Sequence, residues 1–252
     1  QVLRSALSIE KQGVAMAGGK GKRSLMAPEE IKTLGEKLGF PDSRIERLIY
    51  ASRMGAKVDN TAIQDGYQLY HHAFFVSEKG DWAIVQQGMK AEDRTARRYH
   101  WLSRNVKSFV VEPHEGILGA YRITNVLNMT AREAEGNRKA SVDIAKERPQ
   151  KLRSLLRSVT RGPLDRWLGR CDVGIPVLRM PWSINWNAIK RAYELQPKNY
   201  EELLSIRGIG PATVRALSLV AELVYGEPAS WRDPVKYTFA HGGKDGVPYP
   251  ID

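Results

Sequence analysis

The sequence has almost no cysteine and no long hydrophobic run. Its single cysteine among 252 residues, Cys171, excludes an internal disulfide framework and a metal site built on a CxxC pair. The most apolar stretches, His72–Val76 and Ala216–Tyr225, are far shorter than the roughly 20 residues that cross a bilayer. The first residues show no secretion signal. We therefore expect a cytoplasmic protein that does not enter a membrane.

Acidic residues are also in deficit. Lys and Arg number 39 against 28 Asp and Glu, which gives a net charge of +11. A field of this sign attracts polyanions, as in nucleic-acid binders but also in membrane-surface and heparin binders. Most of the excess falls in residues 138–170, where ten basic residues, Arg153 and Arg157 among them, face three acidic ones. This stretch is either part of a nucleic-acid footprint or a solvated helical linker.

The spacing of apolar residues predicts an α+β fold. Pro28 opens one helix, and apolar residues at helical spacing predict a second helix over Asp42–Met54. Tyr67–Phe75 and Trp82–Gln86 alternate as strands do, and turn-forming residues separate them. These two strands predict a β-hairpin with one buried face.

The pattern divides the chain into three units. Residues 1–128 form an α+β domain that is expected to carry any catalytic site. Residues 129–170 form a basic helical middle, and residues 171–252 form a helical module with a glycine-rich tail. The less regular stretches are interpreted as a basic loop at Gly18–Arg23, helix or loop at Arg94–Arg104, a short strand at Lys107–Val111 and a connector at 171–186.

The strongest motif is a pair of helices joined by glycines near the C-terminus. Asn199 caps a short helix, and Pro211 opens a second helix that ends at Gly226. Between them, two glycines let the backbone turn tightly and approach a ligand, while Ile209 anchors the turn in the core. The free N–H groups at the start of the second helix form an anion site suited to a phosphodiester. A tight turn between two core helices is the structural alternative.

This segment resembles the helix-hairpin-helix family of DNA-binding modules. The family pattern is a hydrophobic residue, a spacer, Gly-hydrophobic-Gly and a helix of small and apolar residues, which Ile206–Gly210 and the residues after Pro211 match. The resemblance implies binding of DNA, or in the alternative RNA, through phosphate contacts with little sequence preference. The residues assigned to this contact are Arg207, Gly208, Ile209, Gly210, Ala212 and Arg215.

A wider resemblance covers nearly the whole chain. Three further stretches are unusual in composition, namely Gly66–Phe75, Trp82–Gly88 with Arg94–Trp101, and Ser230–Gly246. Together with the helical pair they resemble a prokaryotic family, archaeal and bacterial, that is known as a domain of unknown function with a C-terminal helix-hairpin-helix. The resemblance implies no activity, so the chemistry has to come from the residues.

The predicted β-hairpin carries candidate catalytic residues. Asp65 precedes the first strand, His71 lies on it, and Glu78 lies in the turn that follows. An acid before a strand and an acid at the next turn could hold Mg²⁺ or Mn²⁺, which activates water in many phosphodiester hydrolases. The residues predicted to bind the metal are Asp65 and Glu78. The alternative is a capping acid, a turn acid and a satisfied core histidine.

The stretch Arg94–Trp101 contains both cations and aromatic residues. Such a stretch can hold phosphates and stack bases, so Arg94, Arg97 and Trp101 are candidates for nucleic-acid binding and Arg98 for stabilising charge during catalysis. Packing of these side chains inside a core is an equally weighted alternative.

Three classes of function remain open. The leading hypothesis is a metal-dependent nuclease of DNA repair or maintenance. The second is a monofunctional DNA glycosylase, since helix-hairpin-helix glycosylases carry a catalytic Asp after the hairpin, where this chain has Asp233. Ala212 stands where lyase-type members carry Lys, and the β-rich first half departs from their helical fold. The third is a DNA-binding protein without catalysis.

Overall fold

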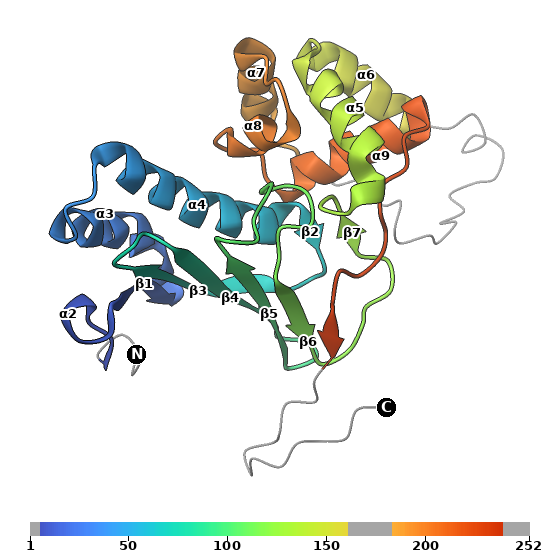
Figure 1. Cartoon of the computed structure of the whole chain (residues 1–252). Coiled ribbons are helices and arrows are strands. Elements are labelled where there is room, and N and C mark those ends of the chain that lie inside the picture. Colours follow the sequence, from blue (N-terminus) through green and yellow to red (C-terminus); the bar gives the residue numbers. More distant parts are fainter. Residues whose placement is uncertain (1–5, 161–182, 239–252) are drawn as a thin grey trace.

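A mixed sheet and a group of helices make up the two halves of the molecule in the computed structural model (Figure 1). The structure describes residues 6–160 and 183–238. The end of the basic stretch, most of the predicted connector and the glycine-rich tail lie outside the described residues. The α+β class predicted from the apolar pattern is confirmed.

The main sheet has six strands in the order β1-β3-β4-β5-β6-β8. Neighbouring strands are antiparallel except β6 and β8, which are parallel. The predicted hairpin is confirmed as β3 and β4, and Gly80 in its turn has φ 82°. The strands span Val14–Lys20 (β1), Gln68–Ser77 (β3), Trp82–Lys90 (β4), Thr95–Leu102 (β5), Gly116–Gly119 (β6) and Tyr237–Thr238 (β8).

The first strand corrects the predicted basic loop at Gly18–Arg23. Gly18 and Gly19 belong to β1, and only the residues from Gly21 onward leave the sheet, as a 3₁₀ helix, η1 (Gly21–Met26). Gly18 has φ 83°, and a Cβ there would lie 2.2 Å from the carbonyl oxygen of His72 on β3. Glycine therefore lets β1 lie this close to β3, which the local pattern, read as turn-forming, does not reveal.

Two other predictions in this half were wrong. Arg94–Arg104, predicted as helix or loop, is mostly β5, in which alternate residues point into the core. Lys107–Val111, predicted as a short strand, is an irregular segment whose Phe109 ring stacks on Trp82 at 6.2 Å. Local propensity is only a weak guide to strand formation, and in both stretches tertiary packing decided the backbone conformation.

Two helices cover one face of the sheet, α3 (Ala27–Lys37) and α4 (Asp42–Thr61). The predicted second helix is confirmed and extends seven residues past Met54. Its buried face includes Leu48 and Val58, which join the core beneath it. Gly55 allows α4 to lie close to β4, since a Cβ there would be 2.8 Å from Cδ1 of Ile84. A short helix, α2 (Ile9–Gln12), precedes β1.

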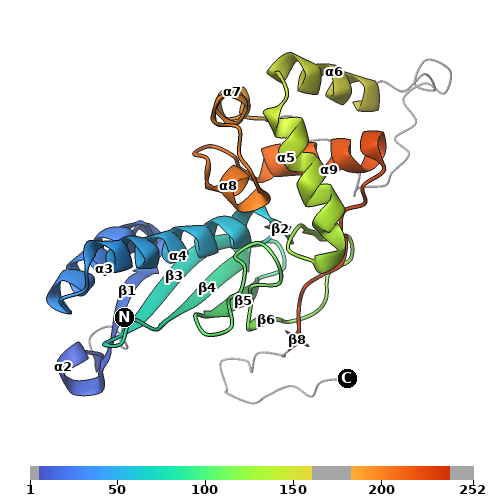
Figure 2. The same cartoon turned by 45° about the horizontal axis from the view of Figure 1, so that its top comes forward.

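The remaining helices pack on one another beside the end of α4. Figure 2 shows α5 crossing α9, and α6 lying beyond them. The helices predicted in the basic middle are confirmed up to residue 160. These elements are η2 (Arg132–Ala134), α5 (Glu135–Lys146), α6 (Pro149–Thr160), α7 (Trp186–Leu195), α8 (Tyr200–Ser205) and α9 (Pro211–Tyr225).

The three sequence units are interleaved in space. A two-stranded sheet of β2 (Ile63–Gln64) and β7 (Leu127–Asn128) lies between the halves, and the chain after α9 returns to the main sheet as β8. The basic middle packs against the C-terminal helices through α5 and α9. Within the described part of the chain, no helix has the length and apolar character to cross a membrane.

Candidate nucleic-acid interface

The first helix of the C-terminal pair begins as its cap predicts. The side-chain oxygen of Asn199 accepts a hydrogen bond from the amide of Glu202 at 2.9 Å. The Glu202 carboxylate in turn accepts from the amide of Lys198 at 2.8 Å, one residue before the cap. With its donors satisfied in this way, α8 buries Leu203 and Leu204 in the helical core.

The segment Ile206–Gly210 joins α8 to α9, and we call it the α8–α9 turn. Ile209 is fully buried, and its amide donates to the carbonyl of Ile206 at 3.1 Å. Gly208 has φ 92°, and a Cβ there would lie 2.8 Å from Nδ2 of Asn185. Helix α7 therefore backs the turn closely, and Arg191 of α7 donates to the carbonyl of Arg207 at 2.5 Å.

The start of α9 faces open space. Gly210 is the N-cap, with extended backbone, and it provides no side-chain cap. A Cβ at Gly210 would meet nothing within 4 Å. Among the described residues, the amides of Gly210 and Ala212 have no hydrogen-bond acceptor. The first amides of a helix carry a partial positive charge, so this end of α9 can accept an anion. The predicted ends of α9, Pro211 and Gly226, are confirmed.

Two arginines flank the turn in different ways. Arg207 is exposed beside it. Arg215 is half-buried and lies over the Trp231 ring at 5.4 Å, and burial lowers its pKa. Gln64 of β2 donates to the carbonyl of Pro211 at 2.8 Å. Within the described part of the chain, the exposed Arg207 is thus accessible to a polyanion, whereas Arg215 helps to hold α9 against the sheet domain.

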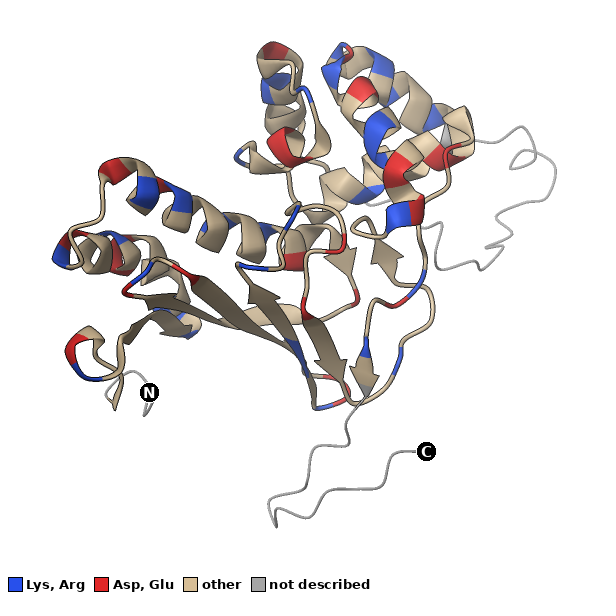
Figure 3. Cartoon of the chain, in the orientation of Figure 1, with Lys and Arg blue, Asp and Glu red and all other residues tan. Residues whose placement is uncertain are grey.

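The basic middle reaches the turn through α7. Arg153 of α6 lies over the ring of Trp186, the first residue of α7, at 4.4 Å. From Trp186 to Arg191, five residues along α7, the axis advances about 8 Å. Arg153 and Arg157 are both exposed, and Figure 3 shows further basic positions on α5 and α6. The helix α7 therefore connects the basic surface of α6 to the back of the α8–α9 turn.

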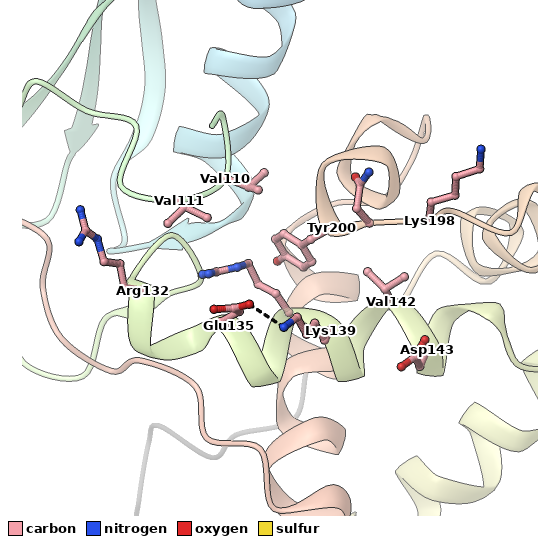
Figure 4. Close-up of a pocket in the computed structure, with 11 residues that line it drawn as sticks. Val110, Val111, Arg132, Glu135, Lys139, Val142, Asp143, Lys198 and Tyr200 are labelled. Carbon is pink, nitrogen blue, oxygen red and sulfur yellow. Dashed lines mark ion pairs between the residues drawn. The ribbon is translucent and has the colours of Figure 1, made fainter. Parts of the chain in front are cut away.

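A cavity of about 670 Å³ lies between α5, the start of α8 and Val110–Val111 (Figure 4). Its cations are largely neutralised, because Lys139 pairs with Glu135 at 2.6 Å and Arg132 with Glu112 at 2.7 Å. Tyr200 points toward α5, and its hydroxyl has no partner in the described part of the chain. With its charges compensated, this cavity offers a polyanion less than the α8–α9 turn does.

The structure does not bring the predicted metal ligands together. Asp65 precedes β3 and Glu78 follows it, so the ten-residue strand separates them by about 30 Å. Glu78 is exposed beside Gly13, whereas Asp65 is buried. His71, on the strand between them, is half-buried, and burial lowers its pKa. No group of three His, Cys, Asp or Glu able to hold a metal occurs among the residues described. Asp65 and Glu78 do not form one site.

Asp65 instead belongs to a buried clamp around Arg97. The Arg97 guanidinium pairs with Asp65 at 2.9 Å and with Asp233 at 2.8 Å, and all three side chains are nearly inaccessible. The Tyr99 hydroxyl also donates to Asp65, at 2.6 Å. Burial raises the pKa of Asp65 and acts to lower that of Arg97, but the two carboxylates raise the Arg97 pKa overall. The clamp ties β5 to the segment after α9.

The rest of Arg94–Trp101 divides by strand alternation. Trp101 is buried, and its indole N–H donates to Asp59 at 3.0 Å. Arg98 is exposed on β5, and Arg94 is exposed in the turn before it, with φ 54°. Arg97 and Trp101 therefore lie inside the domain, and a bound nucleic acid would not reach them, whereas Arg94 and Arg98 remain accessible.

Sequence reasoning placed His72 and Gln86 in a polar cluster on the hairpin but missed the buried polar chain that joins them to α4. Ser52, Asp59, His72 and Gln86 are each at most 6% exposed and are joined by hydrogen bonds. The residues at helical spacing from Asp59 are small and apolar, Gly55, Ala56 and Ala62, and this is a weak local signal of a buried carboxylate. Nothing near Asp59 in the sequence identifies its partner, because Gln86 is 27 positions away.

The comparison with known proteins identifies one family. The family model described as "Protein of unknown function (DUF763)" matches residues 1–251, so the chain belongs to this family. The search of curated proteins and the search of solved structures return no match.

Proposed function

We propose that this member of the DUF763 family binds DNA through a helix-hairpin-helix made of α8, the α8–α9 turn and α9. The observation that carries the proposal is the uncapped, open N-terminus of α9, where the amides of Gly210 and Ala212 are unpaired within the described structure. No protein group accepts from these amides in the described structure, so a phosphate oxygen can bond them, and the partial positive charge of the helix end favours its charge.

The proposed contact would involve the sugar-phosphate backbone of the DNA and not the edges of its bases. Main-chain amides that bind phosphate oxygens position the duplex but carry no sequence information. The exposed Arg207 beside the turn adds a cation without a base-specific geometry. Binding with little sequence preference suits DNA repair or maintenance better than site-specific regulation, so we assign the protein to that kind of process.

The described structure supports DNA binding better than it supports catalysis at Asp65 or Asp233. A nuclease centred on Asp65 needs a free carboxylate, and a glycosylase centred on Asp233 needs one too. Both carboxylates accept hydrogen bonds from the buried Arg97. We therefore place the proposed function in the helical pair and leave these two acids to the fold.

The first test is the salt dependence of DNA binding. We expect duplexes of unrelated sequence to bind with similar affinity, and log K to fall linearly with log salt by about 0.9 for each phosphate contact. Fluorescence anisotropy of three labelled duplexes across a salt series measures this. Absence of binding at low salt would reject the proposal, and a strong preference for one sequence would reject the backbone-contact mechanism.

The basic surface of α6 is expected to extend the contact. Reversing Arg153 and Arg157 to Glu should lower the magnitude of the salt slope by about 2 and weaken binding to all duplexes alike. The matched control reverses Lys32 and Lys37, which are exposed on α3 at the other end of the molecule. This control makes the same change in net charge. Equal losses in the two variants would show a general field effect and no local contact at α6.

A further inference from the structure

A cleft of about 470 Å³ opens over the sheet where β1 stops short of β3. β1 ends opposite His71, so Leu69 and Tyr70 of β3 have no β1 partner. The chain leaves the sheet there as η1, and the cleft lies between η1, α4 and the exposed part of β3. Ser52, His72 and Gln86 are among the residues that line it.

The polar side chains at the cleft form a hydrogen-bonded series. The hydroxyl of Ser52 lies 2.8 Å from Nε2 of His72, and Nδ1 of His72 lies 3.0 Å from Oε1 of Gln86. The side-chain amide of Gln86 donates to Asp59, which is fully buried and also pairs with His114. Helix α4 supplies the serine and the aspartate, and the sheet supplies the histidine and the glutamine.

This series determines where the histidine proton lies. The Asp59 carboxylate only accepts, so the Gln86 amide must turn its NH₂ toward Asp59 and its oxygen toward His72. Nδ1 of His72 therefore carries the proton, and Nε2 presents a lone pair to the Ser52 hydroxyl. Burial lowers the pKa of His72, although Gln86 and Asp59 oppose the change, and this favours the neutral ring. A neutral imidazole in this tautomer is a general base for the serine.

The charge of the cleft indicates the substrate. Arg53 and Lys57 line it from α4, one turn apart on the helix. No carboxylate is among the described residues that line the cleft. Cations without competing acids stabilise negative charge on the non-bridging oxygens of a phosphate ester. A neutral carboxylic ester has no such charge before attack, so a phosphate diester fits this lining better.

We propose that this cleft is a catalytic site that hydrolyses phosphate diesters, with Ser52 as nucleophile and His72 as general base. The Oγ–P bond forms as the bond from phosphorus to the leaving oxygen breaks, and the Ser52 proton passes through Nε2 of His72 to that oxygen. Water then attacks phosphorus and gives its proton to Nε2, the Oγ–P bond breaks, and the proton returns to Ser52. The products are an alcohol and a phosphate monoester.

The proposed catalytic activity is separate from DNA binding, because none of its residues belongs to the α8–α9 turn. Ser52 and His72 are only 2% and 6% exposed, but unlike Arg97 and Trp101 they line the cleft, so the proposal requires the substrate to reach them through it. Arg53 and Lys57 would also touch the substrate, and Gln86 is a positioning residue that acts through His72. A small diester reaches the cleft without the helical pair, so failure of the catalytic proposal and failure of the binding proposal give different results.

The test uses the whole chain with a fluorophosphonate probe and with bis(p-nitrophenyl) phosphate. We expect the probe to modify Ser52, identified by peptide mass spectrometry, and the diester to release p-nitrophenolate. Ser52→Ala should abolish both, and His72→Gln should slow both by about 100-fold or more. Gln86→Leu should slow both and move the pH dependence of the rate, because His72 loses the partner that fixes its tautomer. A purely structural role would leave the pH profile in place.

The matched control is Ser141→Ala, which removes another buried helical serine, on α5 and outside the cleft. It should leave labelling and hydrolysis unchanged, and thermal melts of each variant report folding. A folded wild-type chain with no adduct on Ser52 overturns the proposal, whether or not the variants fold. Hydrolysis of p-nitrophenyl acetate without hydrolysis of the diester overturns the assigned substrate class.

Discussion

Replacing Arg97 with leucine is expected to lower the free energy of unfolding by about 3–5 kcal/mol, because it leaves buried carboxylates without their cation. Arg97 pairs with Asp65 and Asp233, whose side chains are 1% and 4% exposed. The Tyr99 hydroxyl, the amide of Tyr67 and the amide of Ile123 remain as donors but carry no charge. Denaturant unfolding followed by tryptophan fluorescence measures the change.

The control for this substitution is its neighbour on β5. Arg98 is exposed, so Arg98→Leu should change the free energy of unfolding by no more than about 0.5 kcal/mol. If the two variants are equally stable, the clamp does not hold β5 to the C-terminal segment, and the stability of the fold rests on apolar packing alone.

Replacing Gly210 with aspartate is expected to weaken DNA binding by about 10- to 100-fold, which corresponds to the loss of one or two charge-assisted hydrogen bonds. The open space at Gly210 accepts a side chain, and Asp at an N-cap bonds the next helical amides. Its carboxylate would occupy the amides offered to a phosphate and repel that phosphate. The folded state should be as stable as the wild type or more so.

The isosteric control is Gly210→Asn, which caps the helix without adding charge. We expect an intermediate loss of affinity with the same thermal stability, because the amides are occupied but the phosphate is not repelled. Anisotropy titrations at one low salt concentration rank the three proteins. If Gly210→Asp binds as the wild type does, the start of α9 is not the contact, and the turn joins core helices only.

Most of the helices and the central hairpin were predictable because their signals are local. Asn199, Pro211 and Gly226 mark helix ends through the few residues around them. The alternation of Tyr67–Phe75 indicates a strand in the same way. Two of the predictions that failed concern Gly18–Lys20 and most of Arg94–Arg104, which became strands because a neighbouring strand pairs with them. The third is the opposite error, since Lys107–Val111 was predicted as a strand and is irregular.

The candidate residues were harder to predict than the elements that carry them. Asp65, Arg97 and Trp101 were chosen as residues for chemistry or nucleic-acid contact, but all three are buried. Strand alternation on β5 directs Arg97 and Trp101 into the core, and the bend before β3 places Asp65 against Arg97. Ser52 shows the opposite error, since it was not chosen as a candidate. Nothing in the sequence of its own helix indicates a functional role. A side chain's surroundings depend on the strand register and on helix packing, neither of which is contained in the spacing of nearby residues.

By itself the sequence determined the basic charge, the helical pair with its open turn, and the β-hairpin. Each depends on composition or on patterns within one short stretch of the sequence. Only the tertiary structure decided which buried polar groups meet. Arg97 reaches Asp233 across 136 positions, and Ser52 reaches His72 across 20. A buried polar group must find a partner wherever the fold places one, so these contacts follow from packing and not from local sequence.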